Sequence, residues 1–260
     1  MHTNSLSVRP LGGVFGADVT GVDLSVPPPA AVSAALSAAV SRYGLLIFRS
    51  PRASAQGIAG LMCAFGALQQ TLYVNTLRNP SADEAACARP EECIAMMTDP
   101  LASIAHSHVA LLHAEEAPFG GESIWCSLAD AYDGISVPMR AYLDPLEVVP
   151  FSRAGFPRPL VASHPLTKRK HLGIGASFKG HILNVPAEES DLVVDLAQNL
   201  LTVPENQIRI PWARGMVVLW DCRLTQHYPV GGYGAPGWRL RCISACDAAA
   251  DPFAATLRME

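Results

Sequence analysis

Short apolar runs separated by turn residues recur along this chain and predict a protein built mainly of β-strands. The stretch 6–26 is rich in glycine and short apolar runs, which predicts a β-ribbon with tight turns. The apolar run 44–48 is bounded by a glycine and an arginine and predicts a buried strand. Further strands are expected at 92–97 and 107–114. The segment 207–246 adds three β-rich runs, QIRIPW, GMVVLWD and WRLRCISAC.

Helical patterns lie between these strands. Four segments carry them, namely 30–42, 54–66, 125–143 on both sides of Val137-Pro138, and 186–201. The polar, turn-rich stretch 75–92 predicts a loop. There is no internal repeat, low-complexity tract or linker. Short strands with a few peripheral helices therefore predict one domain over residues 1–260, a β-sandwich with flanking helices.

Composition narrows the class of protein and its compartment. The chain has 260 residues, is 50% hydrophobic and carries a net charge of −4 without a basic block, which argues against nucleic acid as a partner. The first residues lack the pattern of a signal peptide, and no apolar stretch is long enough to span a membrane. Seven cysteines without a C-x-x-C pair fit a reducing compartment, as small buried hydrophobes. We expect a cytoplasmic protein, and a homo-oligomer is compatible with the sequence.

One segment near the C-terminal end allows a family to be identified. Residues 214–230, RGMVVLWDCRLTQHYPV, resemble the taurine dioxygenase family, whose last metal-binding histidine lies in a W-D-N-R-x-T-Q-H sequence. In this chain the run extends from Trp220 to His227, with Cys222 in place of the asparagine. Five other segments match the family in order, at 10–25, 43–49, 111–125, 164–170 and 186–196, and the match fails mainly at 75–108.

The resemblance implies a fold, two cofactors and a type of substrate. The expected fold is mainly β with flanking helices (α+β), a double-stranded β-helix or jelly-roll. Enzymes of this family hold Fe(II) and 2-oxoglutarate and oxidise a small molecule. The metal is bound by two histidines and one carboxylate on one face, which leaves three positions open for the keto acid and oxygen. An arginine forms a bidentate pair with the far carboxylate of 2-oxoglutarate.

Three residues take family roles directly. The resemblance makes His227 the last metal ligand. It puts the cosubstrate arginine at Arg239, with Arg241 as the alternative if the register of the strand slips. Ser123, in the run GGES, stands where the family has a threonine that hydrogen-bonds the same carboxylate. The alternative interpretation of each is non-functional: His227 would be a structural histidine, Arg239 a surface arginine and Ser123 a turn serine.

The first metal motif departs from the family, because no H-x-D sequence occurs in this chain. His106 and His108 lie two residues apart and would give a three-histidine site with His227. Met97-Thr98-Asp99 matches the family spacing better, but methionine is a poor Fe(II) ligand, so that alignment leaves Asp99 and His227. A third alternative is that no metal binds. We prefer the three-histidine site on chemical grounds.

Two further positions bear on the substrate. Tyr73 follows Phe65-Gly66 at the spacing where taurine-type enzymes place substrate-facing residues, although a core tyrosine fits equally well. The family's sulfonate-binding arginine falls on Ile243, which argues against taurine.

The sequence therefore predicts an Fe(II)- and 2-oxoglutarate-dependent dioxygenase for a small molecule other than taurine, in specialised metabolism. Two alternatives remain. One is an enzyme on the same scaffold with an altered or absent metal site that catalyses isomerisation, cyclisation or elimination. The other is a non-catalytic ligand-binding protein.

Overall fold

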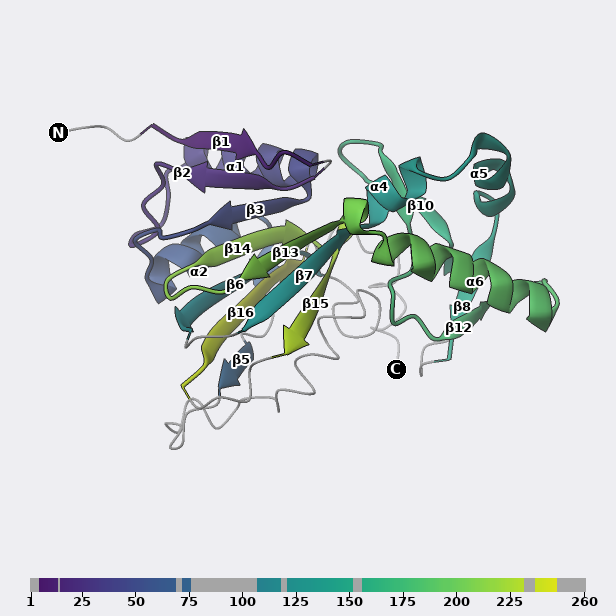
Figure 1. Ribbon diagram of the computed structural model, residues 1–260. Helices are drawn as coiled ribbons and strands as arrows, with labels where there is room; N and C mark the ends of the chain where they lie inside the picture. Colours follow the sequence, from purple (N-terminus) through teal and green to yellow (C-terminus); the bar gives the residue numbers. More distant parts are fainter. Residues whose placement is uncertain are drawn as a thin grey trace, which may run out of the picture.

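Two β-sheets face each other in the main body of the protein, and helices lie outside them (Figure 1). The computed structural model describes residues 5–13, 15–68, 72–75, 107–117, 121–151, 156–231 and 237–246.

The larger sheet has eight strands in the order β1-β2-β3-β14-β6-β16-β4, and β5 also pairs with β16. Neighbouring strands are antiparallel except β2 and β3, which are parallel. Its strands are β1 (Ser7–Pro10), β2 (Ala17–Thr20), β3 (Leu45–Phe48), β4 (Ala67–Leu68), β5 (Leu72–Asn75), β6 (Ser107–Glu116), β14 (Val217–Asp221) and β16 (Arg239–Cys246).

A three-stranded antiparallel sheet covers one face of the larger sheet. Its order is β13 (Gln207–Pro211), β7 (Glu122–Ser127) and β15 (Thr225–Gly231). The chain passes repeatedly between the two sheets, since β6 leads into β7 and β13 through β16 alternate between them. Two smaller sheets join β8 (Glu147–Pro150), β9 (Arg158–Pro159) and β12 (Gly180–Ile182), and pair β10 (Val161–Ser163) with β11 (Lys170–Leu172).

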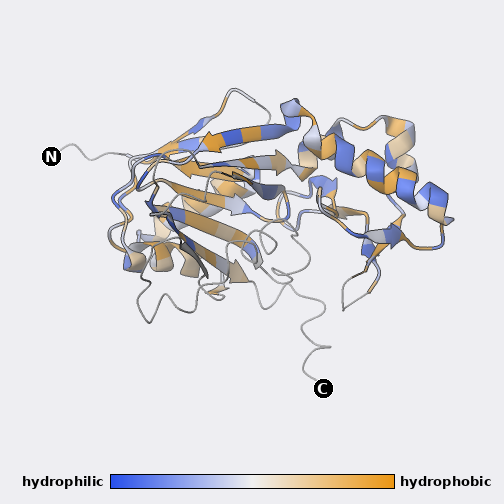
Figure 2. Cartoon of the chain, turned by 60° about the horizontal axis from the view of Figure 1, so that its bottom comes forward, coloured by the Kyte–Doolittle hydropathy of each residue, from blue (hydrophilic) through white to orange (hydrophobic). Residues whose placement is uncertain are grey.

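Both faces of the larger sheet are buried, which explains its apolar strands. In β3, Leu45 and Ile47 belong to an inner cluster between the two sheets, whereas Leu46 and Phe48 belong to an outer cluster beneath α1 (Ala30–Tyr43) and α2 (Ala55–Cys63). Successive side chains of a strand point to opposite faces, so a strand covered on both sides is apolar throughout. Figure 2 shows this concentration of hydrophobic residues on the strands.

The inner cluster contains all four tryptophans of the chain, Trp125, Trp212, Trp220 and Trp238. They come from both sheets and from the segments that join them, and each has a nearly or fully buried side chain. Large aromatic side chains thus pack between the two sheets.

A separate apolar cluster lies beside the two sheets, under the helices on the right of Figure 1. Those helices are α4 (Leu128–Asp133), α5 (Val137–Leu143), α6 (Ala187–Thr202) and the short 3₁₀ turn η1 (Pro204–Asn206). In α6 the buried Val193, Val194, Ala197 and Leu201 follow helical i, i+3, i+4 spacing. No helix in the described part of the chain is both long and apolar enough to cross a membrane.

Most of the predicted elements are confirmed. The ribbon at 6–26 is the antiparallel pair β1–β2, and the helices at 30–42, 54–66 and 186–201 are α1, α2 and α6. The strands at 44–48 and 107–114, and the three runs in 207–246, are also present. Apart from Asn75, which ends β5, the predicted loop 75–92 and strand 92–97 lie outside the described residues.

Two predictions of local structure need correction. The helical pattern at 125–143 is wrong at its start, because residues 125–127 complete β7 and the Ser127 side chain caps α4 by accepting a bond from Asp130 N at 3.0 Å. The strand β15 was missed, because Pro229 and a short polar sequence gave no clear strand pattern. That strand carries His227.

Candidate functional site

His227 points into the space between the two sheets. It lies opposite Trp125 in the β15–β7 register, and cross-strand partners share a face of their sheet. The centroid of its ring is 4.6 Å from that of Trp125 and 5.7 Å from that of Trp220. Its exposed fraction is 2%. The residue assigned as a ligand is therefore enclosed by indoles of the inner cluster.

Both ring nitrogens of His227 lack a hydrogen-bond partner in the part of the chain that the structure describes. Burial lowers the pKa of His227 to about 3, so the ring is neutral at pH 7. A neutral imidazole has one nitrogen lone pair, which is the group that binds a metal ion. Buried polar atoms normally have partners, so these two nitrogens fit a position that a ligand completes.

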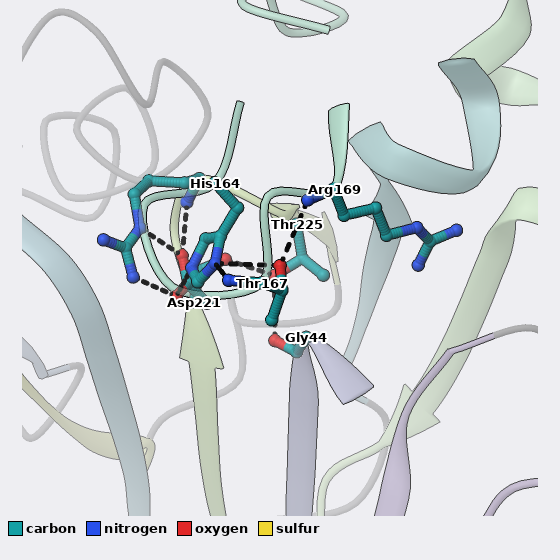
Figure 3. Close-up of polar contacts among 7 residues, drawn as sticks. Gly44, His164, Thr167, Arg169, Asp221 and Thr225 are labelled. Atoms are coloured by element: carbon teal, nitrogen blue, oxygen red, sulfur yellow. Dashed lines mark hydrogen bonds and ion pairs between the residues drawn. The ribbon is translucent and has the colours of Figure 1, made fainter. Parts of the chain in front are cut away.

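The residues before His227 fix its strand through a buried carboxylate at the end of β14. Asp221 is fully buried and accepts hydrogen bonds from Nε and the backbone N of Arg223, both at 2.9 Å, and from Nε2 of His164 at 3.0 Å. Figure 3 shows these groups gathered around the Asp221 carboxylate. Burial alone would raise the pKa of Asp221, but the Arg223 and His164 bonds lower it to about 2.

His164 has a defined tautomer in this network. The backbone N–H of Thr167 donates a hydrogen bond to its Nδ1 at 3.2 Å, so Nδ1 is the acceptor. Nε2 therefore carries the ring proton and donates a hydrogen bond to the Asp221 carboxylate. The bond joins residues 57 positions apart in the sequence. His164 therefore has a structural role, because it ties the turn after β10 to the end of β14.

The next two residues of the motif anchor the start of β15. The Thr225 hydroxyl lies 3.0 Å from the Asp221 carbonyl and 3.3 Å from the Gly44 carbonyl, both of which accept (Figure 3). Oε1 of Gln226 accepts from Ala176 N at 2.7 Å. A Cβ on Gly175 would lie 2.6 Å from the Gln226 amide, so the close approach requires glycine. These polar residues fix the strand, which leaves His227 as the inward-facing side chain available to a ligand.

Ser123 shares the inner face of the small sheet with Trp125, since the two residues are two apart on β7. Its side chain is fully buried and its Oγ accepts a hydrogen bond from Nε1 of Trp212 at 3.0 Å. The predicted cosubstrate hydroxyl is thus on the same side of the sheet as His227.

Arg239 and Arg241 lie on the other side of the larger sheet. Trp238, Leu240 and their neighbour Cys242 pack in the inner cluster, so the arginines between them leave from the opposite face. Nε of Arg239 lies 2.8 Å from Glu115 Oε2, and Nη2 of Arg241 lies 2.7 Å from Glu115 Oε1. The structure brings these two arginines to one carboxylate and does not bring them to His227.

Comparison with known proteins assigns the chain to a family. The model of the taurine catabolism dioxygenase TauD, TfdA family matches residues 7–243. This chain belongs to that family. It is 27% identical over 264 residues to an alpha-ketoglutarate-dependent sulfate ester dioxygenase of Pseudomonas putida, covering 90% of this chain and 87% of that protein. It is 24% identical to an alkylsulfatase of Acinetobacter baylyi, covering 89% and 82%.

Solved structures agree with the fold. A taurine dioxygenase from Burkholderia xenovorans matches with a TM-score of 0.78 and 25% identity over 93% of this chain and 91% of that one. The fold of AAD-2, solved with Mn(II) and N-oxalylglycine, matches with a TM-score of 0.77 at 19% identity, covering 94% and 98%. The jelly-roll predicted from the sequence is confirmed, as is the membership in a family of 2-oxoglutarate-dependent dioxygenases.

The first metal motif of this TauD/TfdA family member lies mostly outside the described residues. His106, Met97 and Asp99 all do, so neither predicted ligand set can be built from described atoms. His108 is half-buried on β6, beside a register shift, and its carbonyl accepts from Cys222 N at 3.0 Å. Within the described ranges, no group of three or more His, Cys, Asp or Glu side chains could hold a metal ion.

The remaining predicted residues are placed in part. Tyr73 lies on β5 opposite Arg241, and its side chain is outside the description. Ile243 is buried in the outer cluster, in the face of the sheet that α1 and α2 cover. Sequence reasoning missed the Asp221–Arg223 pair and Trp125. The W-D-x-R-x-T-Q-H run could have indicated the first of these, because an aspartate and an arginine two residues apart can pair.

Proposed function

We propose that this chain is a non-haem iron, 2-oxoglutarate-dependent oxygenase that oxidises a small molecule other than taurine. The observation that carries the proposal is His227, a buried neutral imidazole with two unpartnered nitrogens in the interior of a TauD/TfdA-family fold. Bound Fe(II) and 2-oxoglutarate would supply the oxidising chemistry. His227 would hold the metal together with His106 and His108, or with Asp99.

The interior of the fold supports chemistry that requires exclusion of water. The hydrophobic residues around His227 are the tryptophans and aliphatic side chains of the inner cluster. Such surroundings strengthen electrostatic interactions with a bound ligand and protect reactive species from solvent. Ser123 is proposed to position the cosubstrate, and Tyr73 to face the substrate.

The proposed exclusion of taurine rests on the position of Ile243. A sulfonate needs a cationic partner, and an isoleucine with 3% exposure in an apolar cluster cannot supply one. Relatives of this chain are named for sulfate esters and sulfonates, so the substrate is proposed to be a small organic molecule of related size that is recognised by other residues.

Arg239 is proposed to bind the far carboxylate of 2-oxoglutarate, in competition with Glu115. A guanidinium group that pairs with one carboxylate can exchange it for another of the same geometry. Binding beside His227 would also require a change in β16, because the Arg239 side chain leaves the sheet on the opposite face.

One observation favours a second candidate function. Arg239 and Arg241 leave the sheet on the side opposite His227, and no H-x-D motif exists. An enzyme on the same scaffold that uses an altered metal site for isomerisation, cyclisation or elimination would need neither an arginine beside His227 nor an H-x-D motif. The two candidates differ in whether 2-oxoglutarate binds.

Metal analysis with and without 2-oxoglutarate tests the proposal. We expect one iron per chain after anaerobic loading and a weak visible charge-transfer band when the keto acid is added. His227→Ala should lose the iron. His171→Ala, a control histidine that is equally buried and bonded through Nδ1 to the Leu172 carbonyl at 3.0 Å, should keep it. Iron without the band favours the second candidate, and equal iron in His227→Ala rejects His227 as a ligand.

A further inference from the structure

Trp125 places a second unsatisfied polar group beside His227. Its side chain is fully buried, and its Nε1 has no hydrogen-bond partner in the part of the chain that the structure describes. Trp212, another indole of the inner cluster, does use its N–H, which donates to Ser123 at 3.0 Å. The unpaired donor of Trp125 thus lies at the position opposite His227 in the β7–β15 register.

A metal ion at His227 would not satisfy this group. A metal takes a lone pair from the imidazole, whereas an indole N–H can only donate and requires an acceptor. The hydrophobic side chains that surround Trp125, including Trp220 at 5.9 Å between ring centroids, offer none. The described side chains offer this N–H no acceptor, and a molecule that enters the space between the sheets can supply one.

We propose that the indole N–H of Trp125 donates a hydrogen bond to a carboxylate oxygen of the small molecule that binds at His227. The inference rests on the proposed function and adds a ligand-binding residue to it. An oxygen acceptor with negative charge is favoured, because charge-assisted hydrogen bonds are shorter and stronger than neutral ones, more so in a buried site. Trp125 and His227 would then hold two parts of one ligand complex, the oxyanion and the metal.

Trp125→Phe tests this, since phenylalanine keeps an aromatic ring and removes the donor. The probes are Mn(II) alone and 2-oxoglutarate added to the Mn(II)-loaded full chain, both followed by calorimetry. We expect Mn(II) affinity to stay within a factor of about three, because an indole N–H has no lone pair to offer a cation. The affinity for 2-oxoglutarate should fall roughly ten- to a hundred-fold, as for the loss of one hydrogen bond to a charged group.

Thermal melting of the ligand-free protein gives a second, independent readout. Trp212→Phe removes the same atoms and also breaks the hydrogen bond from Trp212 to Ser123, so its melting temperature should fall further than that of Trp125→Phe. A larger fall in Trp125→Phe would mean that its N–H has a partner in the folded chain, and would overturn the inference. So would an unchanged affinity for 2-oxoglutarate, or a loss of Mn(II) binding in Trp125→Phe. A wild type that binds Mn(II) but no 2-oxoglutarate overturns the proposed function, and this inference with it.

Discussion

Glu115 on β6 pairs with Arg239 on β16, with 2.8 Å between Oε2 and Nε, on the face of the large sheet that is turned away from the small sheet and His227. The guanidinium proposed for the cosubstrate is thus held by a carboxylate of the chain itself. The same carboxylate also pairs with Arg241. Binding of 2-oxoglutarate by Arg239 therefore has a competitor whose removal can be tested.

Replacing Arg239 with alanine is expected to weaken 2-oxoglutarate binding by roughly ten- to a hundred-fold, because one hydrogen-bonded pair with a charged group contributes about 1.5–3 kcal/mol. Calorimetry on the Mn(II)-loaded protein measures this. Arg214→Ala is the matched control, since Arg214 pairs in the same way with the neighbouring Glu116, at 3.0 Å, and is largely exposed. Equal affinity in Arg239→Ala would contradict the assignment and favour the second candidate function.

Replacing His227 with leucine should stabilise the metal-free protein. Two buried ring nitrogens without partners cost about 1–3 kcal/mol of unfolding free energy, and leucine fills a similar space without polar atoms. Urea denaturation in the presence of a chelator should show a gain of this size, while metal binding is lost. A variant that is less stable than the wild type would mean that His227 is a structural residue.

The Asp221 network should dominate the stability of the region that positions His227. Asp221→Ala leaves Arg223 and His164 without their shared acceptor, and removing one partner of a buried pair typically costs about 3–5 kcal/mol. Asp144→Ala, which removes a partly exposed ion pair with Lys170 and a hydrogen bond from the Tyr132 hydroxyl, should cost less. Urea denaturation compares the two, and equal losses would show that the network contributes no more than a surface pair.

Stability should fall with acid between about pH 6.5 and pH 4 because of His113. Burial, with a smaller effect of the Arg241 charge, lowers the pKa of His113 from 6.5 to about 4. The unfolded chain then binds a proton that the folded chain does not, so the stability present above pH 6.5 is lost as the pH falls toward 4. Urea denaturation at several pH values measures the slope.

The control for this effect is a second histidine. His113→Gln should reduce the slope, whereas His181→Gln, which changes an exposed side chain, should leave it as in the wild type. A slope that is the same in all three proteins would mean that other groups cause the acid sensitivity.

The sequence by itself determined the fold and the family. Apolar runs such as Leu45–Phe48 can only be strands covered on both faces, and the helical spacing in Ala187–Thr202 can only bury one side. The run from Trp220 to His227 identified the family, and several of its polar residues make hydrogen bonds that fix the start of β15.

The tertiary structure decided which side chains meet. His164 and Asp221 are 57 residues apart, and Trp125 and His227 are brought together only by the β7–β15 register. Alternation along β16 indicates which residues share a face, but it does not say which sheet covers that face. Arg239 could therefore be named from the sequence, whereas its pairing with Glu115 could not. Contacts between distant strands depend on the register of the strands and on which face of the sheet is covered. Both are set when the strands pack together, so the sequence of one strand does not reveal them.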